Sequence, residues 1–348
     1  MNWLLKIYRK IVPEKLRETY NKEFQKLRIS WMNRRGMERK KYGTLNKDKT
    51  FYIIRTDSTQ HWGIGTTCTM VLNNIKYAAN KGWIPVIDYK NHYLYCLQDE
   101  KDRGKENAWE YYFEQPNPIY SLDEVYKSRN VILGPIWGQP AGSLSWNNVD
   151  DIYDEKYDIY FELTRQYIRI NPEVLRKAEK LRKELFAHSG DKKILGVGIR
   201  AGLYWGEVTK DGSYRNHPEG LSIEEYIEQT RKYMNEFGCE YIFVSCDDRY
   251  YLERMKQEFG EKCVYIGYRT LAHMFDYNGC PNISIEERSV EVKEESMEKR
   301  TLDYIMEIYL LSKCDSLIMV KGGGAMLACL LNNKEYDNYY VLKKNIVQ

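Results

Sequence analysis

Long hydrophobic runs are missing from this sequence of 348 residues. A membrane-spanning helix needs about 18 or more consecutive apolar residues, and no stretch approaches that length. The N-terminus also lacks the compact apolar segment and small-residue cleavage site of a secretory signal. Hydrophobic residues still make up 43% of the chain and charged residues 30%, a balance typical of a globular protein of two ordinary domains. We therefore expect a cytoplasmic protein.

The spacings that mark metal sites and disulfide frameworks are missing as well. The eight cysteines contain no Cys-x-x-Cys pair and mostly have apolar neighbours; they are Cys68, Cys96, Cys239, Cys246, Cys263, Cys280, Cys314 and Cys329. No Asp-x-Asp triplet, which would favour a divalent cation, is present. The pattern predicts buried thiols, and it predicts no metal ligand and no structural disulfide.

Positive charge is concentrated at one end of the chain. Residues 1–42 contain 13 Lys and Arg against 4 Glu, a net charge of +9, whereas the rest of the chain has a net charge of −6. Within this arm, apolar residues recur at helical spacing with basic residues between them; they are Leu4, Ile7, Tyr8, Ile11, Leu16, Tyr20, Phe24 and Leu27. The pattern predicts one or two basic amphipathic helices.

Three roles for this arm follow from its charge and periodicity. It could lie on an anionic membrane surface, pack against the body of the protein as an additional helix, or bind nucleic acid. Nucleic acid ranks last, because the remaining chain is acidic and contains no recognisable nucleic-acid-binding module. We therefore expect no nucleic-acid partner, and the first two roles remain open.

Behind the arm, short apolar runs alternate with helical patterns in two series. The first series predicts strands at 50–56, 84–88 and 131–134 and helices at 66–81 and 174–186. The second predicts strands at 194–199, 241–245, 264–266 and 316–320 and helices at 222–237, 249–259, 302–312 and 325–331. This alternation indicates parallel sheets covered by helices. The predicted fold is α/β, with a helical arm at 1–45, an α/β domain at 46–190 and a Rossmann-like domain at 191–348.

Two candidate ligand-binding positions follow predicted strands, where parallel sheets bind ligands. Gly63 and Gly65 come after the first strand and would let the backbone approach a ligand, although a plain tight turn explains them equally well. Arg200 ends the strand that contains Gly198, and its guanidinium could bind a diphosphate through two parallel hydrogen bonds. An ordinary surface salt bridge is the alternative role for Arg200.

A third candidate lies between the last predicted strand and helix, where Lys321 precedes Gly322, Gly323 and Gly324. Three glycines free the main-chain N–H groups to face an anion, and the dipole of the following helix favours negative charge there. A flexible glycine turn without a ligand is the alternative.

Individually these signals are modest, but their order resembles that in the fucosyltransferase-type glycosyltransferases of the GT-B fold. The matching segments are RTDSTQHWGIGTTCTMVLNNIKYAANKGWIPVID, ENAWEYYFEQP, KKILGVGIRAG, the His217-Pro218 pair, VSCDD and LDYIMEIYLLSKCDSLIMVKGGGAMLACLL. They span about residues 50–333. The α-1,6-, nodulation and protein O-fucosyltransferases share this order, so the resemblance implies two facing Rossmann-like domains, of which 46–190 binds the acceptor and 191–348 the nucleotide sugar.

The resemblance also implies roles for single residues. Arg200 matches the arginine on the β-phosphate of the donor, and one of Asp247 or Asp248 matches the acidic residue that holds guanine. His217 lies in a loop that would face the site. The chain departs from the family pattern at Gly198, where the family has His, and at Ala201 and Leu203. A member that binds the nucleotide without catalysis, or a transferase for another nucleotide sugar, is therefore an alternative.

The chemistry of sugar transfer needs a base for the acceptor hydroxyl and positive charge for the departing diphosphate. We assign the base to Glu207, with Asp211 in reserve, and the positive charge to Arg200 and Lys321 with the glycine amides. This predicts a metal-independent, inverting enzyme without a cofactor. Its donor would be a GDP-sugar, first of all GDP-fucose, and its acceptor a glycan or a lipid-linked oligosaccharide in bacterial surface polysaccharide assembly.

Two further side-chain predictions concern the acceptor side. Tyr111 and Tyr112 could stack on a sugar, although a core position is an equally ordinary use of tyrosine. Acidic pairs such as Asp150-Asp151 are predicted to be solvated surface rather than metal ligands.

Overall fold

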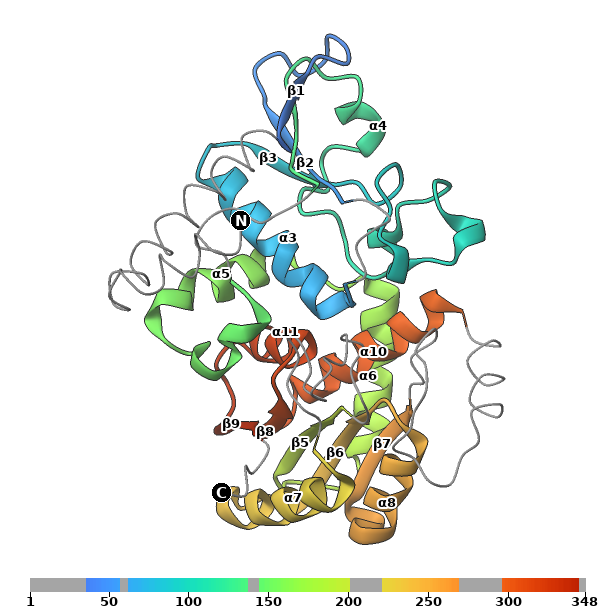
Figure 1. Ribbon diagram of the computed structural model, residues 1–348, viewed down its shortest axis with the longest axis vertical. Coiled ribbons are helices and arrows are strands. Elements are labelled where there is room, and N and C mark those ends of the chain that lie inside the picture. Colours follow the sequence, from blue (N-terminus) through green and yellow to red (C-terminus); the bar gives the residue numbers. More distant parts are fainter. Residues whose placement is uncertain (1–35, 57–61, 137–143, 201–220, 269–295, 344–348) are drawn as a thin grey trace, which may run out of the picture.

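A computed structural model describes residues 36–56, 62–136, 144–200, 221–268 and 296–343, which form two α/β halves, one above the other in Figure 1. Most of the predicted basic arm, residues 1–35, lies outside this part of the chain, as do 57–61, 137–143, 201–220, 269–295 and 344–348. No helix of the described ranges is long and apolar enough to cross a membrane.

The first half contains a sheet of four short strands. They are β1 (Glu38–Lys40), β2 (Phe51–Ile54), β3 (Ile84–Ile87) and β4 (Val131–Leu133), in the order β1-β4-β2-β3. Strand β2 runs parallel to β3 and β4, whereas β1 is antiparallel to β4. Helix α3 (Ile64–Ala79) covers the sheet, and the hydroxyl of Tyr52 in β2 donates to Asn74 Oδ1 of α3 over 2.8 Å.

Strand β1 corrects one expectation, because the helical arm does not reach residue 45. Glu38–Lys40 pair in register with Val131–Leu133 of β4, which would otherwise be an open sheet edge. Arg55, which follows β2, connects the ends of β4 and β1. Its Nε donates to Gly134 O over 2.7 Å and its Nη2 to Glu38 Oε1 over 3.0 Å. The backbone hydrogen bonds to β4 and this ion pair stabilise residues 38–40 as a strand rather than a helix.

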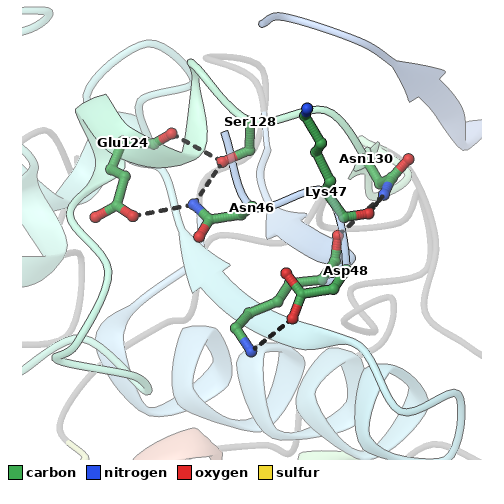
Figure 2. Close-up of polar contacts among 7 residues, drawn as sticks. Asn46, Lys47, Asp48, Glu124, Ser128 and Asn130 are labelled. Carbon is green, nitrogen blue, oxygen red and sulfur yellow. Dashed lines mark hydrogen bonds and ion pairs between the residues drawn. The ribbon is translucent and has the colours of Figure 1, made fainter. Parts of the chain in front are cut away.

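The turn between β1 and β2 is held by side-chain amides, as Figure 2 shows. Asn46 adopts a positive φ of 46°, and its Nδ2 donates to Glu124 Oε1 over 3.0 Å and to Ser128 Oγ over 3.1 Å. Asn130 Nδ2 donates to the carbonyl oxygen of Lys47 over 3.0 Å. Glu124 belongs to helix α4 (Leu122–Val125), so this turn is fixed to the chain that leads into β4.

The second half contains a fully parallel sheet of five strands. They are β5 (Ile194–Ile199), β6 (Tyr241–Cys246), β7 (Cys263–Tyr268), β8 (Ser316–Val320) and β9 (Asn338–Leu342), in the order β7-β6-β5-β8-β9. Helices α7 (Ile223–Phe237) and α8 (Arg249–Phe259) cover the lower face in Figure 1. Helices α6 (Pro172–Phe186), α10 (Met297–Leu311) and α11 (Gly323–Asn332) lie on the side of the first half.

The predicted alternation of strands and helices is confirmed in both halves. Helix α8 and strand β8 have the predicted bounds, while β9 and helix α5 (Asp158–Tyr167) were not predicted. Helix α10 begins at Met297 rather than residue 302, because the Ser296 side chain accepts a hydrogen bond from Lys299 N over 3.0 Å and caps the helix. Helix α11 begins at Gly323, so two of the three glycines belong to its first turn.

One of the hydrophobic clusters formed by the described residues extends across both halves. It includes Ile54 and Leu72 from the first half and Leu317, Met326 and Leu330 from the second, all almost fully buried. Helix α3 packs directly on α11, and the two helices lie between the sheets in Figure 1. The halves therefore meet through packed helices.

Candidate functional site

Two helix N-termini touch where the halves meet. A methyl group on Gly65, in the first turn of α3, would stand 2.3 Å from the carbonyl oxygen of Gly323 in the first turn of α11. A methyl group on Gly323 would stand 2.6 Å from the backbone nitrogen of Thr66. Both distances are shorter than atoms tolerate, so this approach requires glycine on both sides. The first turns of α3 and α11 are therefore in backbone contact.

Neither of these helices has a side-chain cap. Their N-cap residues are Gly63 and Gly322, and neither first turn contains an acidic residue. By contrast, Ser222, Asp248 and Ser296 cap α7, α8 and α10 through side-chain oxygens. The first N–H groups of a helix have no partner within the helix, and the helix dipole favours negative charge near them. The two adjacent N-termini thus form a position suited to an anion.

Arg200 lies beside this position. It follows β5, the central strand of the second sheet, and its Nη1 is 3.4 Å from where a methyl group on Gly322 would stand. The Tyr226 hydroxyl holds its backbone, accepting from Arg200 N over 3.1 Å and donating to Arg200 O over 3.4 Å. Burial raises the pKa of Tyr226, so its hydroxyl stays neutral and can serve in both directions. The structure therefore places the Arg200 guanidinium next to the glycine turn.

Lys321 has a partner that the sequence did not suggest. Its ammonium group forms an ion pair with Asp150, which lies in the 3-10 helix Trp146–Asp151 of the first half. Asp150 lies at the surface, as predicted, and its side chain, 33% exposed, bridges the halves through this pair. No pattern in the sequence links these two positions.

Two glycines of the predicted site have neighbours that explain them by packing. A methyl group on Gly198 in β5 would stand 2.4 Å from side-chain atoms of Met319 in the adjacent strand β8. One on Gly324 would stand 1.9 Å from the hydroxyl oxygen of Tyr304 in α10. Tyr304 thus lies against the first turn of α11, a position that helical spacing alone could not have identified.

Acidic side chains gather at the end of β6. Asp248 is the N-cap of α8 and accepts a hydrogen bond from Tyr251 N over 3.2 Å, while Asp247 is buried beside it. Behind them, Glu307 of α10 accepts from Ser245 Oγ over 2.6 Å, and it is only 1% exposed. Asp248 therefore has a structural role as the cap of α8.

The prediction that Tyr111 and Tyr112 stack on a sugar is wrong for Tyr112. Tyr112 is fully buried and its hydroxyl donates to Leu97 O, so it offers no face to a sugar. Trp109 and Phe113 stack on each other in the same core, with ring centroids 4.6 Å apart. Tyr111 is partly exposed and accepts from Gln98 Nε2 over 2.8 Å, so stacking there stays a prediction.

Three predicted site residues, Glu207, Asp211 and His217, lie outside the described residues, as do Ala201 and Leu203. Their roles stay predictions. Across the described ranges, no group of three or more His, Cys, Asp or Glu side chains is arranged to hold a metal ion.

No protein-family model and no curated protein sequence matches this chain. Among solved structures, it is similar to NodZ α-1,6-fucosyltransferase co-crystallised with GDP, with 15% identity, a TM-score of 0.46 and coverage of 81% of this chain and 92% of that chain. An arginine-to-lysine mutant of Arabidopsis thaliana FUT1 in complex with GDP is 11% identical, with a TM-score of 0.48 and coverage of 98% and 78%. POFUT1 in complex with GDP-fucose is 9% identical, with a TM-score of 0.44 and coverage of 86% and 99%.

At these identities and TM-scores the similarity carries no argument about function. The two α/β halves predicted from the sequence are present in the structure itself. The choice of substrate and the roles of single residues depend on the chain's own site.

Proposed function

We propose that this protein is a glycosyltransferase that takes a sugar from a GDP-sugar donor and transfers it to a hydroxyl group of a glycan. The observation that carries the proposal is the contact between the uncapped N-termini of α3 and α11, with Arg200 beside Gly322. Backbone amides, helix dipoles and a guanidinium suit a diphosphate, which is the leaving group of a nucleotide-sugar donor.

The first choice of donor is GDP-fucose. The order of motifs along the chain resembles that of fucosyltransferases. Asp247 and Asp248 follow the end of β6, where one of the two carboxylates could accept from the N–H groups of guanine. A transferase for another nucleotide sugar is the alternative within the same class.

A thermal-shift panel of GDP, UDP, ADP and TDP tests the nucleotide. GDP is expected to raise the unfolding temperature more than UDP does, because a ligand at free concentration c stabilises the folded state by RT ln(1 + c/Kd), which at equal concentration is larger for the tighter ligand. Equal shifts, or a larger shift with UDP, would remove the guanine assignment.

Transfer requires a base, and we assign this role to Glu207, with Asp211 in reserve. The acceptor oxygen would attack the anomeric carbon while the bond to the β-phosphate breaks, and the carboxylate would take the hydroxyl proton, with inversion and without a metal ion. Glu207→Gln is expected to keep donor affinity and to lower turnover by about 10²-fold or more. Near-normal turnover in this variant, together with an inactive Asp211→Asn enzyme, would transfer the role to Asp211.

A catalytically degenerate nucleotide-binding protein is the second candidate. One observation favours it: where the family pattern has a histidine, this chain has Gly198, and Met319 fills the space in front of it. Measurement of sugar transfer and of donor hydrolysis separates the two candidates, because only the enzyme releases GDP from GDP-fucose.

The basic arm suggests where the reaction takes place. We propose that residues 1–42 bind an anionic membrane at its inner face, where a lipid-linked acceptor for a bacterial surface polysaccharide would be met. Each basic residue near such a surface contributes about 1 kcal/mol, so the full-length protein should bind anionic vesicles in a salt-sensitive way. Unchanged vesicle binding after deletion of residues 1–35, which leaves strand β1 in place, would contradict this role.

A further inference from the structure

The ion pair between Lys321 and Asp150 joins the two halves next to the candidate anion position. Lys321 directly precedes Gly322, the N-cap of α11, and its side chain is 27% exposed. Asp150 belongs to the first half and is 33% exposed. The Asp150 carboxylate therefore pairs with the lysine directly before the N-cap of α11.

The two partners differ in how firmly their backbones and side chains are held. The 3-10 helix that carries Asp150 begins with a capping box formed by Ser145 and Asn148. Its Val149 carbonyl oxygen accepts from the Tyr339 hydroxyl of β9 over 2.7 Å. Lysine has a flexible four-carbon stem, so Lys321 can change partner while Asp150 stays in place.

We propose that Lys321 exchanges partners: it binds Asp150 when the site is empty and a phosphate of the nucleoside diphosphate when the donor or product is bound. The proposal rests on the proposed function, because it takes the diphosphate to lie at the N-terminus of α11. A diphosphate carries more negative charge than a carboxylate, and the helix dipole favours it at that position. Asp150 then competes with the ligand, limits its affinity and promotes release of the nucleoside diphosphate product.

Calorimetric titration of the full-length protein with GDP, GMP and inorganic pyrophosphate tests the exchange. Asp150→Asn keeps the shape of the side chain and removes its charge, so it is expected to bind GDP about two- to fivefold more tightly than wild type does. Lys321→Met is expected to bind GDP about tenfold more weakly. GMP affinity should not change in the Asp150 variant if the lysine binds the β-phosphate.

A double variant separates this competition from other effects of Asp150. If Asp150 acts only through Lys321, Asp150→Asn should have no effect in a Lys321→Met background. Asp151→Asn is the matched control, because Asp151 lies in the same 3-10 helix but pairs with Lys156. It should leave GDP affinity unchanged, and Asp150→Ser provides a second charge-free variant should Asp150→Asn fold poorly.

The outcomes distinguish this proposal from the proposed function. Unchanged or weaker GDP binding in both Asp150 variants would overturn the exchange, and so would tighter binding that persists in the Lys321→Met background. Binding of pyrophosphate without any preference for GDP would leave the exchange standing and overturn the guanine assignment. A wild-type protein that binds neither ligand would overturn both.

Discussion

Replacement of Arg200 by alanine is expected to lower kcat/KM for sugar transfer about 30- to 1000-fold, which corresponds to about 2 to 4 kcal/mol of transition-state stabilisation. The reason is the position of the guanidinium beside Gly322, where the charge of a departing diphosphate would develop. The Tyr226 hydroxyl forms hydrogen bonds with both the N–H and the carbonyl oxygen of Arg200. These bonds fix the backbone from which the guanidinium side chain extends. Steady-state kinetics with GDP-fucose measure the effect.

Two further variants identify what the guanidinium contributes. Arg200→Lys keeps the charge but loses the planar pair of donors, so it should recover only part of the lost rate. Arg231→Ala is the control, because Arg231 is an exposed residue of α7 that pairs with Glu258. Its rate should match wild type, since such surface pairs contribute little. A wild-type rate in Arg200→Ala, with normal folding by circular dichroism, would remove Arg200 from the mechanism.

The strands and helices of both halves could be predicted because their apolar residues recur with regular periods. The sheet strands β5, β6 and β8 are almost fully buried apolar runs, and such runs are visible in any single sequence. Strand β1 could not be predicted this way, because it consists of three exposed charged residues at a sheet edge. Its structure depends on pairing with β4, which lies far away in the sequence.

The candidate site could be predicted only in its parts. Glycine pairs, a strand-end arginine and a glycine turn can each be read from local sequence, but their distances to one another cannot. The contact between Gly65 and Gly323 depends on how the halves dock, and so does the pairing of Lys321 with Asp150. The burial of Tyr112 could not be predicted either, because an aromatic residue has the same local sequence pattern in a core and on a sugar-binding surface.

The contact between the two glycines leads to a prediction in which two opposing effects must be weighed. Alanine is a better helix former than glycine by up to about 1 kcal/mol, so Gly65→Ala in α3 would be stabilising if space were available. The added methyl group would stand 2.3 Å from the carbonyl oxygen and 2.4 Å from the carbonyl carbon of Gly323. Both atoms belong to backbone, which cannot rotate away as a side chain can. Relief therefore requires α3 and α11 to move apart.

We expect Gly65→Ala to lower the free energy of unfolding by about 1 to 3 kcal/mol, the usual cost of overpacking, because the clash outweighs the gain in helix propensity. Gly63→Ala is the matched control for stability two residues away: apart from its chain neighbours, no atom of the described residues lies within 4 Å of its added methyl group, and its φ of −68° and ψ of 163° suit any residue. Chemical denaturation of both variants measures the difference. The same movement should separate the two N-termini, so Gly65→Ala should also bind GDP more weakly than the wild-type protein does. Equal stability of the two variants, with wild-type GDP affinity in Gly65→Ala, would show that the halves do not depend on this backbone contact.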